Sequence, residues 1–351
     1  MSANSCIGLG IVGCGAISRH HIRLTQDDER LRWVAACDVN EATLEERAEE
    51  FDIPGRYTST EDLLADPAVD AVVVATPPPA HLKPTLAAFE AGKHVLVEKP
   101  IGLNAGEVHQ MMDAQSEGLV GACCSSRFRS TATARRAAEI VQGKELGEVR
   151  RLVCTALAPP PEKLDGPLYL YKPNWGALGY LGDWGCYDLD FLLGICGWSL
   201  QPETCLADTV PLHELYAKLC PPIGNSEIQF SAKFRFDDGV VFDFRRATYF
   251  AGTPRNEWLI ECERGTLELA MTQDKPPLTI HRYAATGIDT SVEIEEPNAW
   301  SVVLAGPVLD FVGAILEGRP PHTTLANSLV VQRMTDAVYA SAKSGCAVSL
   351  V

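Results

Sequence analysis

The sequence predicts a two-domain α/β protein, with a parallel sheet covered by helices in the first domain and a mostly antiparallel sheet in the second. The first third of the chain alternates short apolar strands with helical segments, which is typical of a doubly wound parallel sheet. Later, apolar and polar residues alternate strictly from residue 227 to 236, as in a half-buried strand. The 351 residues are 46% hydrophobic and 22% charged, a globular balance with room for about two cores.

Charge, N-terminus and cysteines narrow the class of protein. The formal net charge of −16 argues against nucleic acid or an anionic membrane as partner, because both select basic surfaces. The segment of residues 1–6 is short and polar, unlike a signal peptide. No uninterrupted apolar stretch approaches the roughly 20 residues that a helix needs to span a bilayer. The twelve cysteines are scattered without a Cys-x-x-Cys pair. We therefore expect a cytoplasmic protein with reduced, buried thiols and no metal site.

The first expected strand, Ile7–Val12, runs into Gly13-Cys14-Gly15-Ala16-Ile17-Ser18 and then into a helix. Gly13 permits a tight turn, and Gly15 lets a pyrophosphate approach the helix N-terminus. Ser18 replaces the third glycine of the usual pattern and is small enough to keep helix and strand close. The arrangement favours dinucleotide binding, although a lone Gly-x-Gly also occurs in ordinary turns.

The second expected strand, at residues 33–37, ends in Asp38, 23 residues beyond Gly15. An acid at this distance can accept hydrogen bonds from both ribose hydroxyls and would repel a 2′-phosphate. This favours NAD over NADP. Alternatively, Asp38 is a turn or helix-capping residue before Asn40 and Glu41.

The alternation of strands and helices then continues through the first domain. We expect helices at 41–51, 79–91 and 105–116, and strands at 71–75, 95–97 and near 120–124. Thr76-Pro77-Pro78 follows one of these strands at the sheet edge where a nicotinamide ribose would lie. A simple proline turn is an equally good local interpretation.

The strand Val95-Leu96-Val97 delivers Glu98-Lys99-Pro100 to its carboxyl end. In an open parallel sheet that end faces the ligand crevice, so we expect Lys99 where a cofactor and a substrate meet. Pro100 fixes its own φ and pushes Lys99 towards an extended conformation. The alternative is a solvated lysine in a surface turn.

Beyond Ser125 the pattern changes to antiparallel strands. Residues 237–239, Asp-Asp-Gly, form a hairpin turn after the strand at 227–236, and Val240, Phe242 and Phe244 resume the alternation. Further strands are expected at 149–157, 258–262, 266–269 and 278–283. Two apolar helices, at about 302–316 and 325–344, close the chain.

A long segment at 159–181 is rich in proline, glycine and aromatic residues, including Trp175. Long loops of this kind are often functional, and aromatic faces would suit the alternating C–H and O–H surface of a sugar or polyol. The aromatics could equally anchor the loop.

Gly182-Asp183-Trp184-Gly185-Cys186-Tyr187-Asp188-Leu189-Asp190 follows this segment. If it starts a helix, Asp183, Tyr187 and Asp190 share one face. A carboxylate and a phenol one turn apart can hold and deprotonate an alcohol, helped by an ammonium that lowers the tyrosine pKa. An N-cap aspartate and a half-buried tyrosine are the structural alternative.

Taken together, the chain resembles the glucose-fructose oxidoreductase, inositol dehydrogenase and MocA superfamily over essentially its full length. The resemblance is carried by the glycine turn, Ala75-Thr76-Pro77 with His81, the block from Gly92 to Pro100, the block from Asp183 to Tyr187, and the closing Glu317-Gly318-Arg319-Pro320-Pro321 and Ser341-Ala342-Lys343-Ser344-Gly345.

The resemblance implies a Rossmann domain at 1–124 and a substrate-binding and oligomerisation domain at 125–351, whose large open sheet would join a homodimer or homotetramer. It implies NAD(P)-dependent oxidation or reduction of a sugar, polyol or related cyclic alcohol. Lys99 would be the catalytic lysine, and Asp183 matches the aspartate of the second-domain motif. Most members carry histidine where this chain has Tyr187. Tyrosine there is similar to the subgroup of glucose-fructose oxidoreductases, xylose dehydrogenases and dihydrodiol dehydrogenases.

We therefore expect Tyr187 to take the hydroxyl proton, Lys99 to stabilise the phenolate, and Asp183 to orient the substrate or the lysine. The substrate would contact Lys99, Trp175, Asp183 and Tyr187. The residues expected to bind NAD are Gly13, Gly15, Ala16, Ile17, Asp38, Thr76, Pro77, His81, Glu98 and Lys99.

Two other functions fit the same sequence. A hydrolase or eliminase with captive NAD would oxidise, eliminate and re-reduce its substrate without net redox change. A catalytically silent NAD-binding sensor or scaffold is also consistent, since the usual histidine is missing and a fold does not guarantee activity.

Overall fold

The computed structural model describes residues 6–159, 179–211, 227–248, 250–271 and 276–351. The chain divides into two compact units. The first unit comprises Met1–Arg127 with Trp300–Leu329, and the second comprises Phe128–Ala299 with Val330–Val351. The division at residue 127 lies near the expected boundary at 124, whereas residues 300–329 join the first unit and not the second.

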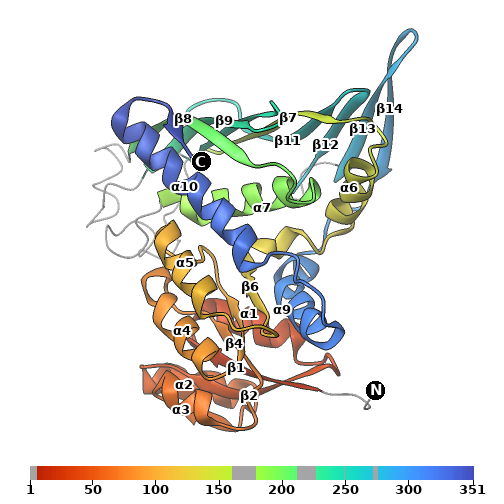
Figure 1. The fold of residues 1–351 in the computed structure, drawn as a ribbon. Coiled ribbons are helices and arrows are strands. Elements are labelled where there is room, and N and C mark those ends of the chain that lie inside the picture. The colour runs from red at the N-terminus through yellow and green to blue at the C-terminus, as the bar shows by residue number, and fades with distance from the viewer. Residues whose placement is uncertain (1–5, 160–178, 212–226, 249, 272–275) are drawn as a thin grey trace. The chain divides into compact units, whose positions relative to one another are not determined.

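The first unit is built on a six-stranded parallel sheet of order β3-β2-β1-β4-β5-β6 (Figure 1). Reversal of the strand order beside β1 is the arrangement that opens a ligand crevice at the carboxyl ends of the strands. The strands are β1 Ile7–Val12, β2 Leu31–Cys37, β3 Gly55–Tyr57, β4 Ala71–Val74, β5 His94–Val97 and β6 Gly121–Cys123.

Helices cover both faces of this sheet, as the alternation predicted. Neighbouring residues of β4 point to opposite faces: Val73 belongs to one apolar cluster, and Val72 and Val74 belong to the other. The first cluster includes residues of α1, α2 and α9, and the second includes residues of α3, α4 and α5. The bounds are α1 Ala16–Thr25, α2 Glu41–Glu50, α3 Thr60–Ala65, α4 Leu82–Glu90, α5 Ala105–Ala114 and α9 Trp300–Glu317, with short 3-10 turns η1 Pro78–Ala80 and η2 Cys124–Phe128.

Helix α9 was expected in the second domain but packs in the first unit, where Phe311 lies in the cluster that also contains Ile22 of α1. By length and composition alone it is the one helix of the described residues that could cross a membrane, with a mean hydropathy of 1.6. More than half of it is buried inside the protein, which is the behaviour of a core helix.

The second unit is built on a nine-stranded sheet of order β14-β13-β12-β11-β7-β10-β9-β8-β15. All neighbouring strands are antiparallel except β7 and β10. The strand β9 begins and ends at the predicted residues, and its apolar face is buried. The bounds are β7 Val149–Leu157, β8 Pro202–Pro211, β9 Glu227–Phe236, β10 Val241–Ala247, β11 Arg255–Cys262, β12 Gly265–Leu269, β13 Leu278–Ala284, β14 Gly287–Ile294 and β15 Val348–Ser349.

Helices lie along one face of this sheet (Figure 1). They are α6 Ala132–Gln142, α7 Cys186–Ile195, and the part of α10 Leu325–Ser344 that belongs to the second unit. Buried phenylalanines form part of the core beneath them: Phe242 stacks on both Phe234 and Phe244, and Phe230 meets Phe244 edge to face. Most of the expected loop, including Trp175, lies outside the described residues.

Candidate active site

The glycine turn has the geometry that a dinucleotide needs. Gly13 has φ +98°, and a Cβ there would lie 2.8 Å from the backbone of Ala75 and Thr76, so the turn requires glycine. A Cβ on Gly15 would meet no atom within 4 Å, which leaves open space above the start of α1. Gly15 is the N-cap of α1 and offers no side-chain cap. The first amides of α1 therefore fit a bound pyrophosphate.

Asp38 lies beside this turn at the end of β2. Its Oδ2 accepts a hydrogen bond from the backbone N–H of Cys14, and its Oδ1 accepts one from Asn40, both at 2.8 Å. The capping residue of α2 is Asn40, whose side chain accepts from the Thr43 amide. Asp38 therefore ties the strand end to the glycine turn. Its contact with ribose stays a prediction.

His81 joins two of the expected cofactor segments. Its ring is buried, with Nε2 2.7 Å from the carbonyl oxygen of Thr76 and Nδ1 2.9 Å from that of Pro100. Burial lowers the pKa of His81, against the opposing effect of the Thr76 hydrogen bond. The turn after β4 is thus held against the turn after β5, which positions Thr76 and Pro77.

Glu98 fixes the backbone of Lys99. The residue is 4% exposed. Its Oε1 lies 2.7 Å from Nε2 of His21 and pairs with Arg127, and its Oε2 accepts a hydrogen bond from the Lys99 amide at 2.9 Å. Burial alone would raise the pKa of Glu98, but the charge of Arg127 and the His21 hydrogen bond hold it well below its usual range. His21, Glu98 and Cys124 carry metal-ligand atoms within 4.8 Å of one another, yet Arg127 already neutralises the carboxylate. This cluster is best explained as the anchor of the catalytic lysine candidate.

In the second unit, Asp183 lies in a π-helical turn, Leu181–Gly185, which continues into α7. The prediction of a helix here is confirmed, but its first turn is wider than the α-helix that the four-residue spacing assumed. Tyr187 is 4% exposed, more buried than the half-buried alternative. The rings of Phe128 and Trp184 meet it edge to face, with centroids 5.5 and 5.8 Å away.

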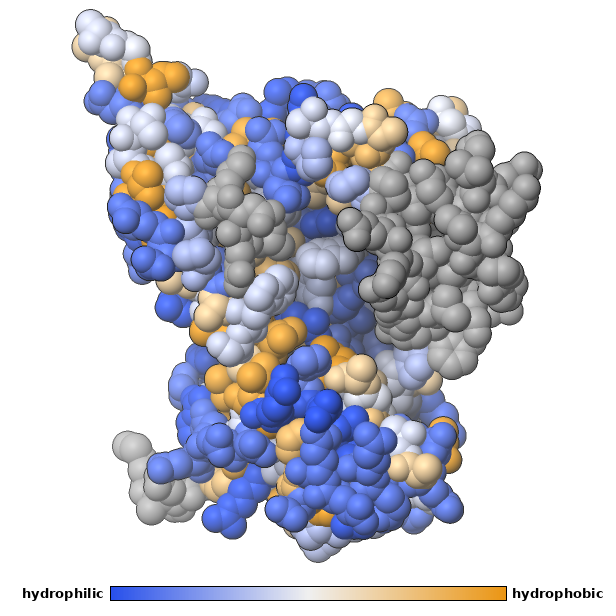
Figure 2. Space-filling model, turned by 180° about the vertical axis from the view of Figure 1, so that it is seen from behind, coloured by the Kyte–Doolittle hydropathy of each residue, from blue (hydrophilic) through white to orange (hydrophobic). Residues whose placement is uncertain are grey.

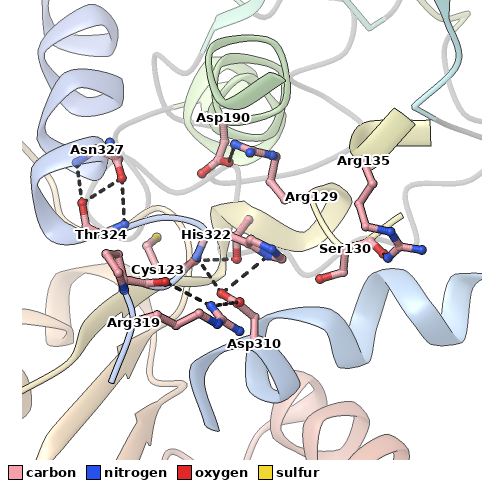
Figure 3. A network of polar contacts seen from close by, with 12 residues as sticks. Cys123, Arg129, Ser130, Arg135, Asp190, Asp310, Arg319, His322, Thr324 and Asn327 are labelled. Atoms are coloured by element: carbon pink, nitrogen blue, oxygen red, sulfur yellow. Dashed lines mark hydrogen bonds and ion pairs between the residues drawn. The ribbon is translucent and has the colours of Figure 1, made fainter. Parts of the chain in front are cut away.

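Asp190, the third residue of the predicted face, is fully buried. Its Oδ1 lies 3.9 Å from Nη1 of Arg129, and Figure 3 shows the two side chains approaching each other below α7. Arg129 passes over Gly194, where a Cβ would lie 1.1 Å from the same nitrogen. Asp190 therefore takes part in a buried ion pair that requires glycine on the next turn of α7.

Sequence reasoning missed a polar network next to Tyr187. Asp188 is fully buried, accepts hydrogen bonds from Nε and Nη2 of Arg246, and accepts one from Nε1 of Trp258 at 2.9 Å. The Arg246 guanidinium lies 5.1 Å from the Trp184 ring centroid and 5.6 Å from that of Tyr180. No local signal could have shown this, because Arg246 and Trp258 come from β10 and β11.

The closing Glu-Gly-Arg-Pro-Pro motif has a structural role in the first unit. Asp310 of α9 is buried and accepts from Nη1 of Arg319 at 2.8 Å and from the His322 amide at 2.7 Å (Figure 3). The next residues reach the sheet, since Thr324 forms a β-bridge with Ala122 of β6. The motif thus folds the chain from α9 back to the sheet edge.

The structure brings most of the expected cofactor residues to the carboxyl edge of the first sheet, at the ends of β1, β2, β4 and β5. It likewise places Asp183 and Tyr187 on one continuous helical segment of the second unit. The individual roles of the residues stay predictions, and Trp175 lies outside the described part of the chain.

Comparison with known proteins assigns both units to one family. Residues 7–120 match the family described as an oxidoreductase family with an NAD-binding Rossmann fold, GFO_IDH_MocA. Residues 134–268 match the GFO/IDH/MocA C-terminal domain. The two matched ranges together cover more than half of the chain.

Relatives and solved structures agree with these matches. The mouse trans-1,2-dihydrobenzene-1,2-diol dehydrogenase is 39% identical over 202 residues, which are 55% of this chain and 57% of the mouse protein. The D-xylose 1-dehydrogenase (NADP(+)) 2 of Haloferax volcanii is 26% identical over 97% of this chain and 99% of its own. A crystal structure of an NAD binding oxidoreductase from Klebsiella pneumoniae has a TM-score of 0.81 at 21% identity, covering 99% of this chain and 100% of that one. This likeness shows a shared fold. The family matches over both units show that the chain belongs to the Gfo/Idh/MocA oxidoreductase family.

Proposed function

We propose that this protein is an NAD(P)-dependent dehydrogenase that transfers a hydride between nicotinamide and a carbinol carbon of a sugar, polyol or related cyclic alcohol. The observation that carries the proposal is the position of Lys99 at the same sheet edge as the glycine turn, where its backbone amide donates a hydrogen bond to Glu98. The relatives named as diol and xylose dehydrogenases support the substrate class.

In this proposal the bound nicotinamide supplies the hydride acceptor for alcohol oxidation. Tyr187, as phenolate, takes the hydroxyl proton while the carbinol carbon loses its hydride, so the products are a carbonyl compound and a neutral phenol. The ammonium of Lys99 stabilises the phenolate and polarises the reacting oxygen. Asp183 orients the substrate or the lysine.

The test is a dehydrogenase assay with NAD and NADP against aldoses, polyols and cyclic diols. We expect reduced cofactor to form in proportion to the substrate oxidised, as seen at 340 nm. Substrate conversion without such accumulation would instead support the captive-cofactor hydrolase or eliminase. Cofactor binding with no turnover across the panel would support the silent sensor.

We further propose that the preferred cofactor is NAD, although the Haloferax relative is named for NADP. Asp38 carries the prediction, because its carboxylate would repel a 2′-phosphate. The Asp38→Asn variant should raise the ratio of kcat/KM for NADP to that for NAD by about tenfold or more, since a charge pair near a surface contributes roughly 1–4 kcal/mol.

Asp70→Asn is the matched control for this variant. Asp70 also accepts a backbone hydrogen bond, from Gly8 at 2.8 Å, but it stands at the opposite end of the parallel strands, just before β4. Its removal should leave the cofactor ratio unchanged. An Asp38→Asn enzyme with the wild-type ratio would contradict the assignment of Asp38 to the ribose.

We also propose that the protein is cytoplasmic and forms a homodimer or homotetramer through the nine-stranded sheet. Support for the assembly comes from large apolar side chains exposed on its outer strands: Leu206, Val210, Tyr283, Ile288 and Val292. Figure 2 shows hydrophobic residues of this kind on the protruding β13–β14 hairpin. Light scattering of the purified chain tests the assembly, and a monomer at micromolar concentration would contradict it.

A further inference from the structure

The π-helical turn that carries Asp183 is held at its first residue, Leu181, by a side chain of another element. The backbone N–H of Leu181 donates to Oε1 of Glu227 at 2.8 Å, and the Tyr339 hydroxyl donates to the same oxygen at 3.1 Å. Glu227 is the first residue of β9, and Tyr339 belongs to α10. Glu227 therefore satisfies the backbone N–H of the first residue of the π-helical turn, which needs a partner once it is buried.

This carboxyl group is buried against the backbone of the segment that it contacts. Glu227 is 5% exposed, and a Cβ on Gly179, which has φ +45°, would lie 1.8 Å from its Oε2. Within the described residues no lysine, arginine or histidine forms an ion pair with Glu227. Among the described residues, the groups that act on it are the backbone amides of residues 180, 181 and 227 and the phenol of Tyr339. The charge of Asp336, on the same helix as Tyr339, raises the pKa of that phenol.

The hydrogen bond between Leu181 and Glu227 is connected to the candidate catalytic residues through the helix backbone. Leu181 opens the π-helical turn that contains Asp183, and that turn continues without a break into the α-helix that contains Tyr187. If the first turn frays at Leu181, the position of Asp183 changes directly, and the packing of Trp184 on Tyr187 changes with it.

We propose that Glu227 is a positioning residue of this enzyme, whose buried carboxyl group fixes the π-helical turn that carries Asp183 and leads to Tyr187, and whose ionisation loosens that turn. The link to catalysis rests on the proposed dehydrogenase function. The link between Glu227 and the order of the helix does not depend on any activity.

The direction of the pH effect follows from burial. Desolvation raises the pKa of Glu227 from 4.5 to about 7, against the opposing hydrogen bonds from Leu181 and Tyr339. Below about 4.5 the carboxyl is protonated whether the segment is closed or open, and above about 7 it is ionised in both states. Between these values the closed form holds a proton that the open form releases, so opening becomes easier as pH rises through this window.

Hydrogen exchange of the cofactor-free protein, read by mass spectrometry on peptides that cover residues 180–190, tests the first link. After correction for intrinsic exchange, we expect the opening constant of the wild type to rise at least about tenfold between pH 5 and 7.5, because each unit of pKa difference is worth a factor of ten. Glu227→Gln, which keeps an acceptor oxygen and cannot ionise, should show no such rise.

Glu268→Gln is the matched control, because this carboxylate lies on β12 of the same sheet, four strands from β9, and pairs with His281. It should keep the wild-type exchange profile. Tyr339→Phe removes one hydrogen bond to the ionised carboxylate and should move the transition to higher pH. If wild type and Glu227→Gln show the same pH dependence, the proposal is wrong.

The pH profile of kcat tests the second link. We expect an ionisation near pH 7 in the wild type that is absent from Glu227→Gln, while the Kd for NADH stays the same because the glycine turn lies in the other unit. A pH-dependent opening in a protein without dehydrogenase activity would retain the Glu227 assignment and remove the proposed function. If the enzyme is active and Glu227→Gln leaves both the exchange profile and the kcat profile unchanged, the proposed function stands and the Glu227 assignment is wrong.

Discussion

Lys99→Met is expected to lower kcat for alcohol oxidation by about 10²- to 10³-fold, the usual loss when one electrostatic stabiliser of a developing charge is removed. Methionine matches the four-atom stem of lysine, with sulfur in place of Cδ, and lacks the ammonium. The backbone at this position should not move, because its amide donates to Glu98, which is itself held by His21 and Arg127. Cofactor affinity, measured by NADH fluorescence, should therefore change far less than kcat.

Lys83→Met provides the control for this prediction. Lys83 lies on α4 of the same unit, and its side chain is exposed with only a distant pairing to Glu61. Its replacement removes the same charge and should leave kcat and NADH binding as they are. If Lys99→Met turned over at the wild-type rate, the lysine would have no part in the chemistry.

The elements around the glycine turn could be predicted because their signals are local. The six residues of β1 are all buried and lead directly into Gly13, and the structure starts and ends this strand where the sequence placed it. The strand β3 and the helix α3 were missed, being only three and six residues long. Such short elements are stabilised by the elements that they pack against and not by their own sequence. The strand β3 is an edge strand, and within the described residues it pairs only with β2.

Partners distant in the chain could not be predicted. Helix α9 follows the second domain in sequence, yet Phe311 packs with residues of β1 and α1 in the first unit. An apolar helix shows that it must be buried and does not show which sheet covers it. The ion pair of Asp188 with Arg246 is similar, since Asp188 lies on α7 and Arg246 on β10, and no local pattern shows that this helix packs on that strand.

In the candidate site, too, the locally determined features could be predicted and the contacts between distant residues could not. The position of Lys99 at a strand end was predicted from three apolar residues and a proline, and β5 ends at Val97 as required. The sequence did not show that the carboxylate oxygens of Glu98 hold His21, Arg127 and the amide of Lys99, and the expected contact of Glu98 with the cofactor stays a prediction. The π-helical turn around Asp183 was also beyond sequence reasoning, because the partner of its first backbone N–H is Glu227 of β9, 46 residues away in the chain.

Tyr187→Phe is expected to lower kcat by about 10²- to 10⁴-fold, the range typical of losing a positioned general base. Phenylalanine keeps the ring that Phe128 and Trp184 contact edge to face, so the helix should remain folded and bind substrate. Tyr283→Phe, an exposed tyrosine on β13, is the control and should have no effect on rate. A Tyr187→Phe enzyme with unchanged kcat and pH profile would assign the proton transfer to another group.

The double variant Lys99→Met/Tyr187→Phe then asks whether the two residues act in one step. Lys99 belongs to the first unit and Tyr187 to the second, so nothing within either unit couples them. If the ammonium serves to stabilise the phenolate, its removal should cost little once the phenol is gone, and the double variant should be about as slow as the slower single variant. Multiplied losses would mean that each residue acts independently, and the ammonium would then act on the substrate oxygen and not through the tyrosine.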